Sequence, residues 1–505
     1  MSHRALLPAS FALLLVPFAA AQALHVEVTS SAAPGNCSVR VTGEPGRPWA
    51  LYFSELEAAT AITPQITIDV DPTRQLASGN FPHGVLPASG QAVVSFPIAG
   101  GFVGRHWTFQ AVSGRPSLEL SNTARAVFLA PASFGPTAYG AVGLSVFGDL
   151  FPLDGGRMLA IGGAGPVAST WEPDRQELLP NGLLPFNLTF AARAQLADGR
   201  VLCAGGLDVT TQQPSAEAWL YDPATGTAES VGPMGSPRAG AAACRLPNGK
   251  VFLFGGLSLI DITNPATLFD GILATSELFD PATNTFTAGP SIAERKAFAT
   301  ATLMNNNQVL VAGGLGVAPI VNLPFVSNLA WTYSATNNTF GLFPKTFTEG
   351  RMFHGATKLS DGRVLLTGGI TADLSGVLTT GDITQIAFVT IGSTALYTTS
   401  GLGSFSVGPV LLETRAFHTA TALDAQKTFV AGGFNGTLDI GAILSGTPVL
   451  PTALATSELL TPGQPAAAGA PMAASRAGAS ALRSPLDGRV VVIGGGPVAI
   501  ELYQP

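Results

Sequence analysis

The chain has 505 residues, with 59 glycines, 38 prolines and only 11% charged residues. This composition favours many short strands joined by tight turns over long solvent-facing helices. The formal net charge of -7 leaves no broad positive surface, so binding to nucleic acid or to an anionic membrane is disfavoured. A chain of this length exceeds one hydrophobic core, so we expect at least two folding units.

Residues 1–23 have the features of a secretory signal peptide. Arg4 precedes an apolar run over residues 5–18, and Ala21 and Ala23 are spaced as a cleavage site. The alternative is an uncleaved membrane anchor, but the run is shorter than the ~20 residues that span a bilayer. We therefore expect a secreted or periplasmic protein with no membrane span after removal of the signal.

Residues 24–130 are predicted to form a β-sandwich accessory domain. Short runs such as HVEVTS and WALYFSE alternate between apolar and polar residues and are separated by glycine and proline turns. The aromatic residues of this region have two interpretations, a glycan-binding platform or the sandwich core, and their position on alternating strands favours the core. They are Trp49, Tyr52, Phe53, Trp107 and Phe109.

An internal repeat dominates residues 131–505. A glycine pair ends an apolar run seven times, at spacings of 43 to 64 residues. A four-stranded propeller blade takes ~40–50 residues, so the later repeats need insertions. We expect the missing side chains to allow close approach of backbone between neighbouring sheets. The pairs begin at Gly162, Gly205, Gly255, Gly313, Gly368, Gly432 and Gly494.

Two predicted strands precede each glycine pair, and two follow it. In RAGAAACRLPNGKVFLFGG, we expect Asn248 and Gly249 to supply the positive φ angles of a tight hairpin turn. The third strand is clearest in TSELFDP at 275–281. Its aromatic residue is matched by Trp171, Tyr221, Tyr333, Tyr397 and Tyr503, with Leu460 as the exception. Because a four-stranded meander cannot bury both faces alone, neighbouring sheets must stack around an axis.

Asp-Gly turns take the place of Asn248-Gly249 in other repeats, at 198–199, 361–362 and 487–488. The glycine pair, this turn and the downstream aromatic together resemble the kelch repeat family over residues 131–505. The resemblance implies an all-β fold, with a seven-bladed kelch-type β-propeller like the central domain of galactose oxidase, preceded by the small β-sandwich. Six blades is the alternative, because the repeat around Gly162 is the least regular. The resemblance implies a scaffold and not one activity.

The two ends of the repeat region are predicted to pair with each other. The last repeat stops at its third strand, IELYQP at 500–505, and lacks a fourth. The segment ASFGP at 132–136 resembles a fourth strand and precedes the first repeat. We therefore expect it to complete the last blade and remove an exposed sheet edge.

Basic residues recur where the first strand of a repeat begins, on the same face as the long segments that follow the glycine pairs. They are Arg238, Arg295, Arg351, Arg415 and Arg476, with His354 and His418 three residues after two of them. One interpretation is a ring of cationic donors for a carboxylate, a sulfate or sugar hydroxyls. The other, favoured because framework residues recur in repeats, pairs each arginine with a third-strand acid such as Glu217, Glu277, Glu458 or Glu501.

The long segments after the glycine pairs are rich in Leu, Ile, Val and Thr, as at 370–393. Long loops at one end of a rigid scaffold often carry the binding function. These loops either form a partner-binding surface or, as we favour, form extra hairpins that pack on one another.

The phrases RMFHGATKLSDGRVLLTGG and RAFHTATALDAQKTFVAGG resemble the strand of galactose-oxidase-like copper radical enzymes that carries a Tyr-His pair. Here Phe353 and Phe417 precede the two histidines. Phenylalanine neither ligates copper nor forms a tyrosyl radical, and two histidines alone are a weak metal site. We expect no metal and no cofactor.

These observations favour a non-catalytic extracellular binding protein whose loop-rich propeller face contacts a protein or carbohydrate ligand. The alternative is a sugar-active kelch-type enzyme, an oxidase, epimerase or lyase, that uses arginine and histidine on that face. Signatures of other enzyme classes are absent from the sequence. An enzyme needs titratable groups that converge in one concave pocket, whereas a binding protein needs a broader loop surface.

Overall fold

A computed structural model gives the fold of the chain. It describes residues 23–505 except for 56, 64–65, 71–83, 114–118, 137–146, 164–165, 186–187, 209, 261–268, 318–323, 383–384, 424–425, 440–450 and 498–499. The predicted signal peptide, apart from its last residue, lies outside the described residues. Within them, no helix has the length and apolar character needed to cross a bilayer.

The chain divides into two compact units. One comprises residues 38–95 and 107–124 together with the chain up to residue 27, and the other comprises residues 28–37, 96–106 and 125–505. This division passes through the N-terminal strands. A domain boundary at residue 130 therefore stays a prediction.

The N-terminal strands form three small sheets. Their bounds are β1 (His25–Ser31), β2 (Gly35–Thr42), β3 (Pro48–Ser54), β4 (Glu57–Thr63), β5 (Ile66–Val70), β6 (Gly84–Val85), β7 (Gln91–Ile98), β8 (His106–Ser113) and β9 (Glu119–Val127). The strand orders are β1-β2-β7, β6-β3-β8-β9 and β4-β5. Trp49, Phe53, Trp107 and Phe109 are buried, and the rings of Phe53 and Trp107 are 5.2 Å apart. The core interpretation of these four aromatic residues is confirmed.

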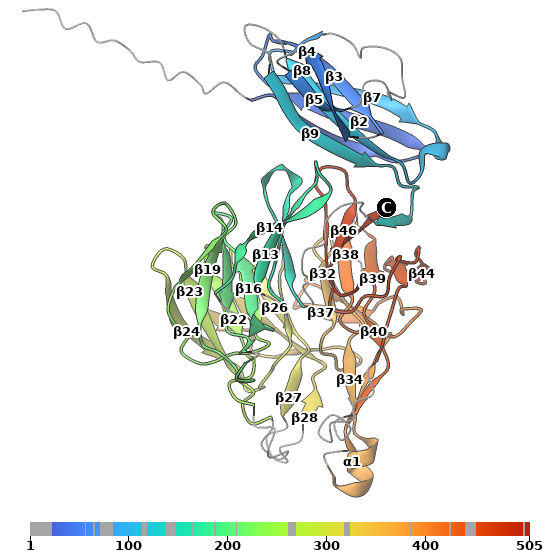
Figure 1. Ribbon diagram of the computed structural model, residues 1–505. Coiled ribbons are helices and arrows are strands. Elements are labelled where there is room, and N and C mark those ends of the chain that lie inside the picture. The colour runs from blue at the N-terminus through green and yellow to red at the C-terminus, as the bar shows by residue number, and fades with distance from the viewer. Residues whose placement is uncertain are drawn as a thin grey trace, which may run out of the picture. The chain divides into compact units, whose positions relative to one another are not determined.

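The strands between residues 133 and 504 form the main body of the larger unit (Figure 1). Their bounds are β10 (Ser133–Pro136), β11 (Asp149–Pro152), β12 (Met158–Ile161), β13 (Val167–Glu172), β14 (Glu177–Leu183), β16 (Ala192–Gln195), β17 (Val201–Ala204), β19 (Ala218–Asp222), β20 (Thr227–Ser230), β21 (Ala242–Arg245), β22 (Val251–Phe254), β23 (Thr275–Asp280), β24 (Thr285–Ser291), β25 (Thr300–Leu303), β26 (Gln308–Ala312), β29 (Leu329–Ser334), β30 (Thr339–Phe340), β31 (Lys345–Thr346), β32 (Gly355–Lys358), β33 (Val364–Thr367), β36 (Thr394–Thr398), β37 (Ser404–Val407), β38 (Thr419–Ala422), β39 (Thr428–Ala431), β43 (Ser457–Leu460), β44 (Ala467–Ala468), β45 (Ser480–Arg483), β46 (Val490–Ile493) and β47 (Ile500–Gln504).

These strands form seven sheets with one shared pattern, a meander of four strands to which one sheet adds a fifth. The orders are β11-β12-β13-β14, β16-β17-β19-β20, β21-β22-β23-β24, β25-β26-β29-β30 with β31 on β29, β32-β33-β36-β37, β38-β39-β43-β44 and β10-β47-β46-β45. We name each sheet by its first strand, namely β11, β16, β21, β25, β32, β38 or β45. The predicted meander is confirmed.

The predicted pairing of the two ends is also confirmed. β10 lies antiparallel to β47, with Ser133 opposite Gln504 and Phe134 opposite Tyr503. The rings of Phe134 and Tyr503 are 5.1 Å apart. The strand ahead of the first repeat thus supplies the fourth strand of the last sheet.

One detail of the predicted turns is wrong. Gly249 has a φ of 85°, but Asn248 is not among the residues with positive φ. The turn needs only one left-handed residue. The Gly249 N–H donates to the Leu246 carbonyl at 3.0 Å, and Asn248 keeps an ordinary backbone. The side chain of Asn248 instead accepts a hydrogen bond from the Lys250 N–H at 3.2 Å.

Seven hydrophobic clusters each contain side chains from two successive sheets. The third-strand aromatics contribute directly, since the ring of Tyr333 in the β25 sheet stacks on Phe252 in the β21 sheet at 4.1 Å. One cluster combines Trp171 of the β11 sheet with Val491 of the β45 sheet. The last sheet therefore packs against the first as the others pack in sequence.

The glycine pairs lie where backbone of the neighbouring sheet comes close. A Cβ on Gly255 would lie 2.0 Å from the carbonyl oxygen of Lys296 in the next sheet, and one on Gly205 would lie 2.2 Å from that of Arg238. Any side chain there would force the sheets apart. The expected role of the missing side chains is confirmed at these positions.

The long segments form a set of small elements, which we call the cap. They are β15 (Leu188–Thr189), β18 (Leu207–Asp208), β27 (Leu315–Val317), β28 (Pro324–Val326), β34 (Ile370–Asp373), α1 (Ser375–Thr380), β35 (Ala387–Thr390), β40 (Phe434–Asn435), β41 (Thr437–Asp439) and β42 (Thr452–Ala453). Figure 1 shows β27, β28, β34 and α1 together at one end of the larger unit. Val317, Ile370, Val377 and Phe388 share one buried cluster there. The segments are thus packed hairpins, as favoured from the sequence.

Candidate functional site

Four of the predicted arginines are buried in the framework. Arg238, Arg351, Arg415 and Arg476 are at most 1% exposed. Each guanidinium donates to the carbonyl of the first glycine of its own sheet's pair, at distances of 2.7, 3.0, 2.8 and 2.6 Å in that order. These bonds join the start of each first strand to the end of the second.

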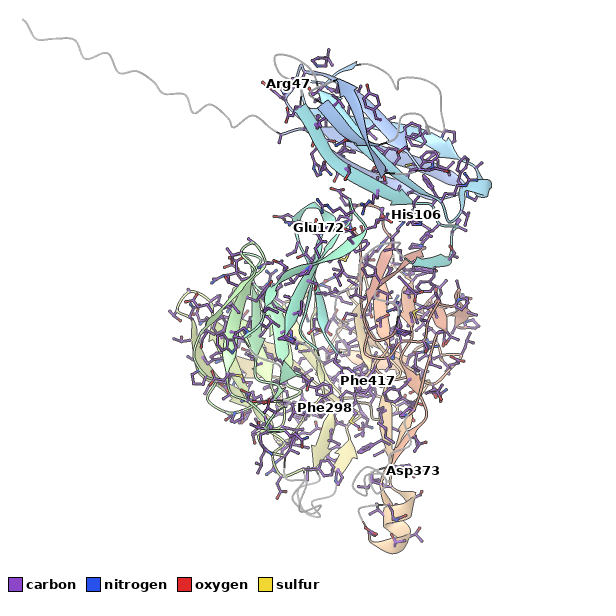
Figure 2. All side chains as sticks on the ribbon, in the orientation of Figure 1. Arg47, His106, Glu172, Phe298, Asp373 and Phe417 are labelled. Carbon is purple, nitrogen blue, oxygen red and sulfur yellow. The ribbon has the colours of Figure 1, made fainter. Side chains whose placement is uncertain are left out.

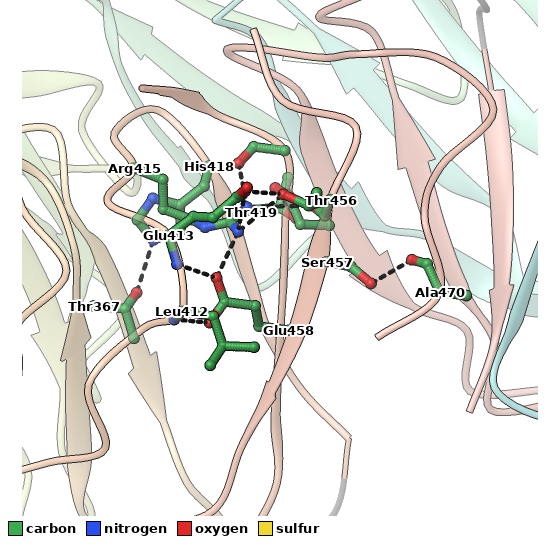
Figure 3. Close-up of polar contacts among 12 residues, drawn as sticks. Thr367, Leu412, Glu413, Arg415, His418, Thr419, Thr456, Ser457, Glu458 and Ala470 are labelled. Atoms are coloured by element: carbon green, nitrogen blue, oxygen red, sulfur yellow. Dashed lines mark hydrogen bonds and ion pairs between the residues drawn. The ribbon is translucent and has the colours of Figure 1, made fainter. Parts of the chain in front are cut away.

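Three of these arginines also form the ion pairs of the framework interpretation. Arg238 lies 2.9 Å from Glu277, and Arg476 lies 2.9 Å from Glu501. Arg415 lies 2.6 Å from Glu458, and Figure 3 shows this pair beside Glu413. The binding role predicted for these residues stays a prediction, and their observed contacts are structural.

Arg295 differs from the other four, because its side chain is exposed. The neighbouring Lys296 takes the framework position, four residues before the first strand, and is 0% exposed. Its ammonium group donates to the Gly313 carbonyl at 3.0 Å and pairs with Glu294 at 2.8 Å. Burial lowers the pKa of Lys296 to about 8, against the opposing effect of Glu294.

His354 and His418 are 7% and 8% exposed, and each contacts the preceding sheet. Their Nε2 atoms lie 3.0 Å from the Thr300 hydroxyl and 2.8 Å from the Thr367 hydroxyl, respectively. Burial lowers the pKa of His418 to about 3, so the imidazole is neutral at pH 7. Both histidines line a pocket at the centre of the seven sheets.

Five phenylalanines close one end of this pocket. Each lies two residues before the first strand of its sheet and has a φ between 52 and 64°. Gly240 and Gly478 take the same position in the other two sheets. Successive ring centroids are 5.2, 5.5, 4.6, 4.2 and 4.9 Å apart around the set. We call Phe147, Phe190, Phe298, Phe353 and Phe417 the phenylalanine circle; Figure 2 labels two of them.

Backbone hydrogen bonds between sheets hold these positions in the left-handed region. The Phe298 N–H donates to the Gly240 carbonyl at 2.7 Å, and the Phe147 N–H donates to the Gly478 carbonyl at 2.8 Å. A positive φ at a residue with a large side chain is unusual and costs ~1–3 kcal/mol, so it persists only where its surroundings impose it. The surrounding backbone of the larger unit therefore imposes the conformation of the phenylalanine circle.

The pocket against the circle has a volume of about 300 Å³. A second space of about 300 Å³ shares Asp149, Arg193 and Thr300 with it and continues along the first strands to Thr302 and Ala356. We call the two spaces together the central channel. Most of its remaining lining is alanine and glycine.

Asp149 and Arg193 are charged residues at strand positions where the other sheets have uncharged residues. At the first residue of the first strand, where one sheet has Asp149, the others have Ala192, Ala242, Thr300, Gly355, Thr419 and Ser480. At the second residue, where one sheet has Arg193, the others have Leu150, Ala243, Ala301, Ala356, Ala420 and Ala481. The two charged groups are 2.8 Å apart, with side-chain exposures of 50% for Asp149 and 2% for Arg193. Neither residue was predicted from the sequence, although an alignment of the first strands isolates both.

No protein-family model matches the chain, and no curated protein sequence matches it. Among solved structures, a fungal alcohol oxidase of the AA5 family, in complex with copper, has a TM-score of 0.52 and 17% identity, over 74% of this chain and 75% of that one. The structure of YjhT has a TM-score of 0.48 and 15% identity, over 64% of this chain and 97% of that one. The likeness to the oxidase shows the fold alone: this chain has a galactose oxidase-like, almost entirely β scaffold.

The central channel does not offer the donors of a copper radical centre. Phe353 and Phe417 have no ligating atom, and the Nε2 atoms of both histidines are bonded to threonine hydroxyls. Among the residues that the structure describes, no three His, Cys, Asp or Glu side chains gather as a metal site. The residues present therefore do not fit such a centre.

Proposed function

We propose that this chain is an exported, non-catalytic carbohydrate-binding protein, and that its larger unit is a seven-bladed kelch-type propeller that holds the ligand in the central channel. The seven clusters between successive sheets support the ring, because one of them joins the last sheet to the first. Export rests on the signal-like residues 1–23.

The observation that carries the proposal is the Asp149–Arg193 pair. A binding site in a repetitive scaffold is asymmetric, and this pair is the charged exception among small side chains. A carboxylate accepts and a guanidinium donates, so together they suit adjacent sugar hydroxyls. The faces of the phenylalanine circle suit the C–H face of a sugar ring.

The shape of the site favours a sugar over a protein ligand. The cap is a packed layer of hairpins, whereas the channel is concave and of about 300 Å³ next to the circle. Small-molecule sites occupy ~300–1,000 Å³, so this space suits one or two sugar units. The proposed site therefore lies in the channel and not on the outer surface of the loops.

A sugar-active enzyme is the second candidate, and Asp149 favours it. This carboxylate is half exposed in a concave pocket, where a bound sugar hydroxyl could reach it. It is the single carboxylate among the described residues that line the channel. Glycoside hydrolysis ordinarily needs two carboxyl groups, so binding without turnover is the stronger proposal.

Glycan-array screening followed by calorimetry tests the proposal, with Asp149→Asn as the diagnostic variant. We expect the variant to bind the selected glycan at least about 10-fold more weakly, because it loses a charged hydrogen bond worth ~1.5–3 kcal/mol. Asp373→Asn, in the cap, is the control and should bind normally. Binding unaffected by Asp149→Asn would overturn the site, and turnover of the bound sugar would favour the enzyme.

A further inference from the structure

We propose that the ligand is an anionic oligosaccharide that enters the central channel end-on, from the end opposite the cap. Its terminal unit lies at the Asp149–Arg193 pair, and its outer acidic units contact Arg245, Lys358 and Arg483. This inference rests on the proposed function and adds to it the direction of entry and the charge of the ligand.

The cap end of the channel is closed by apolar side chains. Phe298, Phe353 and Phe417 of the phenylalanine circle pack against the buried cluster of the cap. Among the described residues, those that line the pocket include the whole circle but no residue of the cap. The circle therefore separates the channel from the cap, and no ligand passes at this end.

The opposite end of the channel is where the first strands finish. The second space extends to Ala243, Thr302 and Ala356, toward the last residues of their strands. Those last residues, in sheet order, are Pro152, Gln195, Arg245, Leu303, Lys358, Ala422 and Arg483. Three of the seven are cations and none is an acid. Since the second and fourth residues of a strand share a face, each of these cations lies on the face of its own sheet that corresponds to the face of Arg193 in the β16 sheet.

These three cations are exposed, and Arg245 lines a pocket together with Asp154, Asp198 and Asp222. Among the residues that the structure describes, none of the three forms an ion pair; Arg483 donates to the Gly488 carbonyl at 3.2 Å. By contrast, cations in the adjacent turns are paired with acids, as Arg200 is with Asp198 at 2.8 Å and Lys250 with Asp280 at 3.0 Å. The positive charge at this end thus belongs to the strand ends.

The charges of two of these cations, Arg245 and Lys358, both act on the thiol of Cys244. Burial raises the pKa of its thiol to about 11, while the charges of Lys358 and Arg245 act in the opposite direction. Cys244 and Arg245 belong to the β21 sheet and Lys358 to the β32 sheet, two sheets further on. Charges from two different sheets therefore act on one side chain, Cys244.

A closed channel with a cationic entrance selects a particular ligand shape. Only the end of a chain reaches the pocket, because an internal unit would need space on both sides. Carboxylate or sulfate groups on the following units would meet the cations at the entrance. The whole chain has a net charge of -7, so most of its surface repels an anionic ligand. The local positive charge at the entrance therefore directs such a ligand to the channel.

The test uses calorimetry on the full chain with a uronic-acid tetrasaccharide and its neutral hexose counterpart. We expect the acidic probe to bind about 10-fold more tightly at low salt, an advantage that shrinks at about 0.5 M salt. In the triple variant R245S/K358S/R483S the advantage should disappear while binding of the neutral probe is unchanged. Arg295→Ser, an exposed cation beside the cap, is the control and should keep the advantage.

End-on entry has its own test. The acidic tetrasaccharide that carries a bulky aromatic group at both ends should not bind. Of the two probes tagged at one end only, the one whose tag is on the end that stays outside the channel should still bind. Equal binding of the doubly tagged probe would overturn end-on entry. An acidic preference that survives in the triple variant would overturn the role of the three cations, while loss of binding of both probes would overturn the channel site as well.

Discussion

The carboxylate of Asp149 and the guanidinium of Arg193 lie 2.8 Å apart and come from the first strands of successive sheets. Arg193 reaches this position because Gly162, the first residue of its glycine pair, has no side chain. A Cβ on Gly162 would lie 2.2 Å from the guanidinium carbon. The first glycine pair therefore makes room for a charged side chain of the site, whereas at Gly205 and Gly255 the nearest atom is a backbone carbonyl oxygen.

Gly162→Ala should lower both stability and glycan binding. The new methyl group displaces Arg193, and alanine at a φ of 80° adds ~1–2 kcal/mol of backbone strain. Gly199→Ala is the matched control, because its φ is 89° and no atom lies near the added methyl group. Urea denaturation should show a larger loss for Gly162→Ala, and calorimetry should show weakened binding for that variant alone. Equal losses of stability would contradict the displacement of Arg193.

Arg415→Met should destabilise the protein by about 3–5 kcal/mol, because it leaves the buried carboxylate of Glu458 without its cation. Arg415→Lys should cost less than half of this, since Lys296 performs the same role in the β25 sheet. Thermal denaturation measures both. Arg295→Ser should stay within about 0.5 kcal/mol of the parent, because this side chain is exposed. Equal costs for the methionine and lysine variants would contradict the framework role.

The repeat made much of this architecture predictable. The glycine pairs, the meander and the pairing of β10 with β47 follow from a pattern that recurs in one register along the chain. Arg295 and Lys296 show how strict the register is: Lys296 precedes its glycine pair by 17 residues, as Arg238, Arg351 and Arg415 do, whereas Arg295 lies one position earlier. A repeated pattern cannot indicate which sheet carries a site.

The candidate site was missed for a related reason. Asp149 belongs to the least regular repeat, and its partner Arg193 is 44 positions away in another sheet. A pattern that averages over repeats hides the one position that departs from it. Two members of the phenylalanine circle, Phe353 and Phe417, were recognised in the sequence beside the histidines, but without an indication that the rings meet.

Stability should fall as the pH decreases from about 6.5 toward 4.5. Burial holds the pKa of His418 at about 3 in the folded state, and that of His354 is also lowered well below its usual value. The unfolded chain binds protons at these residues below ~6.5, so acid favours unfolding by up to ~1.4 kcal/mol per pH unit for each histidine.

His418→Gln should flatten this dependence, because glutamine can bond the Thr367 hydroxyl without titrating. Urea denaturation between about pH 4.5 and 6.5 gives the slope, above the range in which most carboxylates protonate. A slope that is unchanged in the variant would show that His418 is protonated in the fold or is not the source of the effect.

At Phe353, substitution by glycine should destabilise the protein less than substitution by alanine. Its φ is 52°, and its ring lies 4.6 Å from Phe298 and 4.2 Å from Phe417. Both Phe353→Ala and Phe353→Gly lose these contacts, but glycine adopts a positive φ at no steric cost whereas alanine pays ~1–2 kcal/mol. The alanine variant should therefore be the less stable of the two by about 1 kcal/mol in thermal denaturation, opposite to the usual order in strands and helices. The usual order, with glycine the less stable, would mean that the left-handed backbone of the circle does not persist in solution.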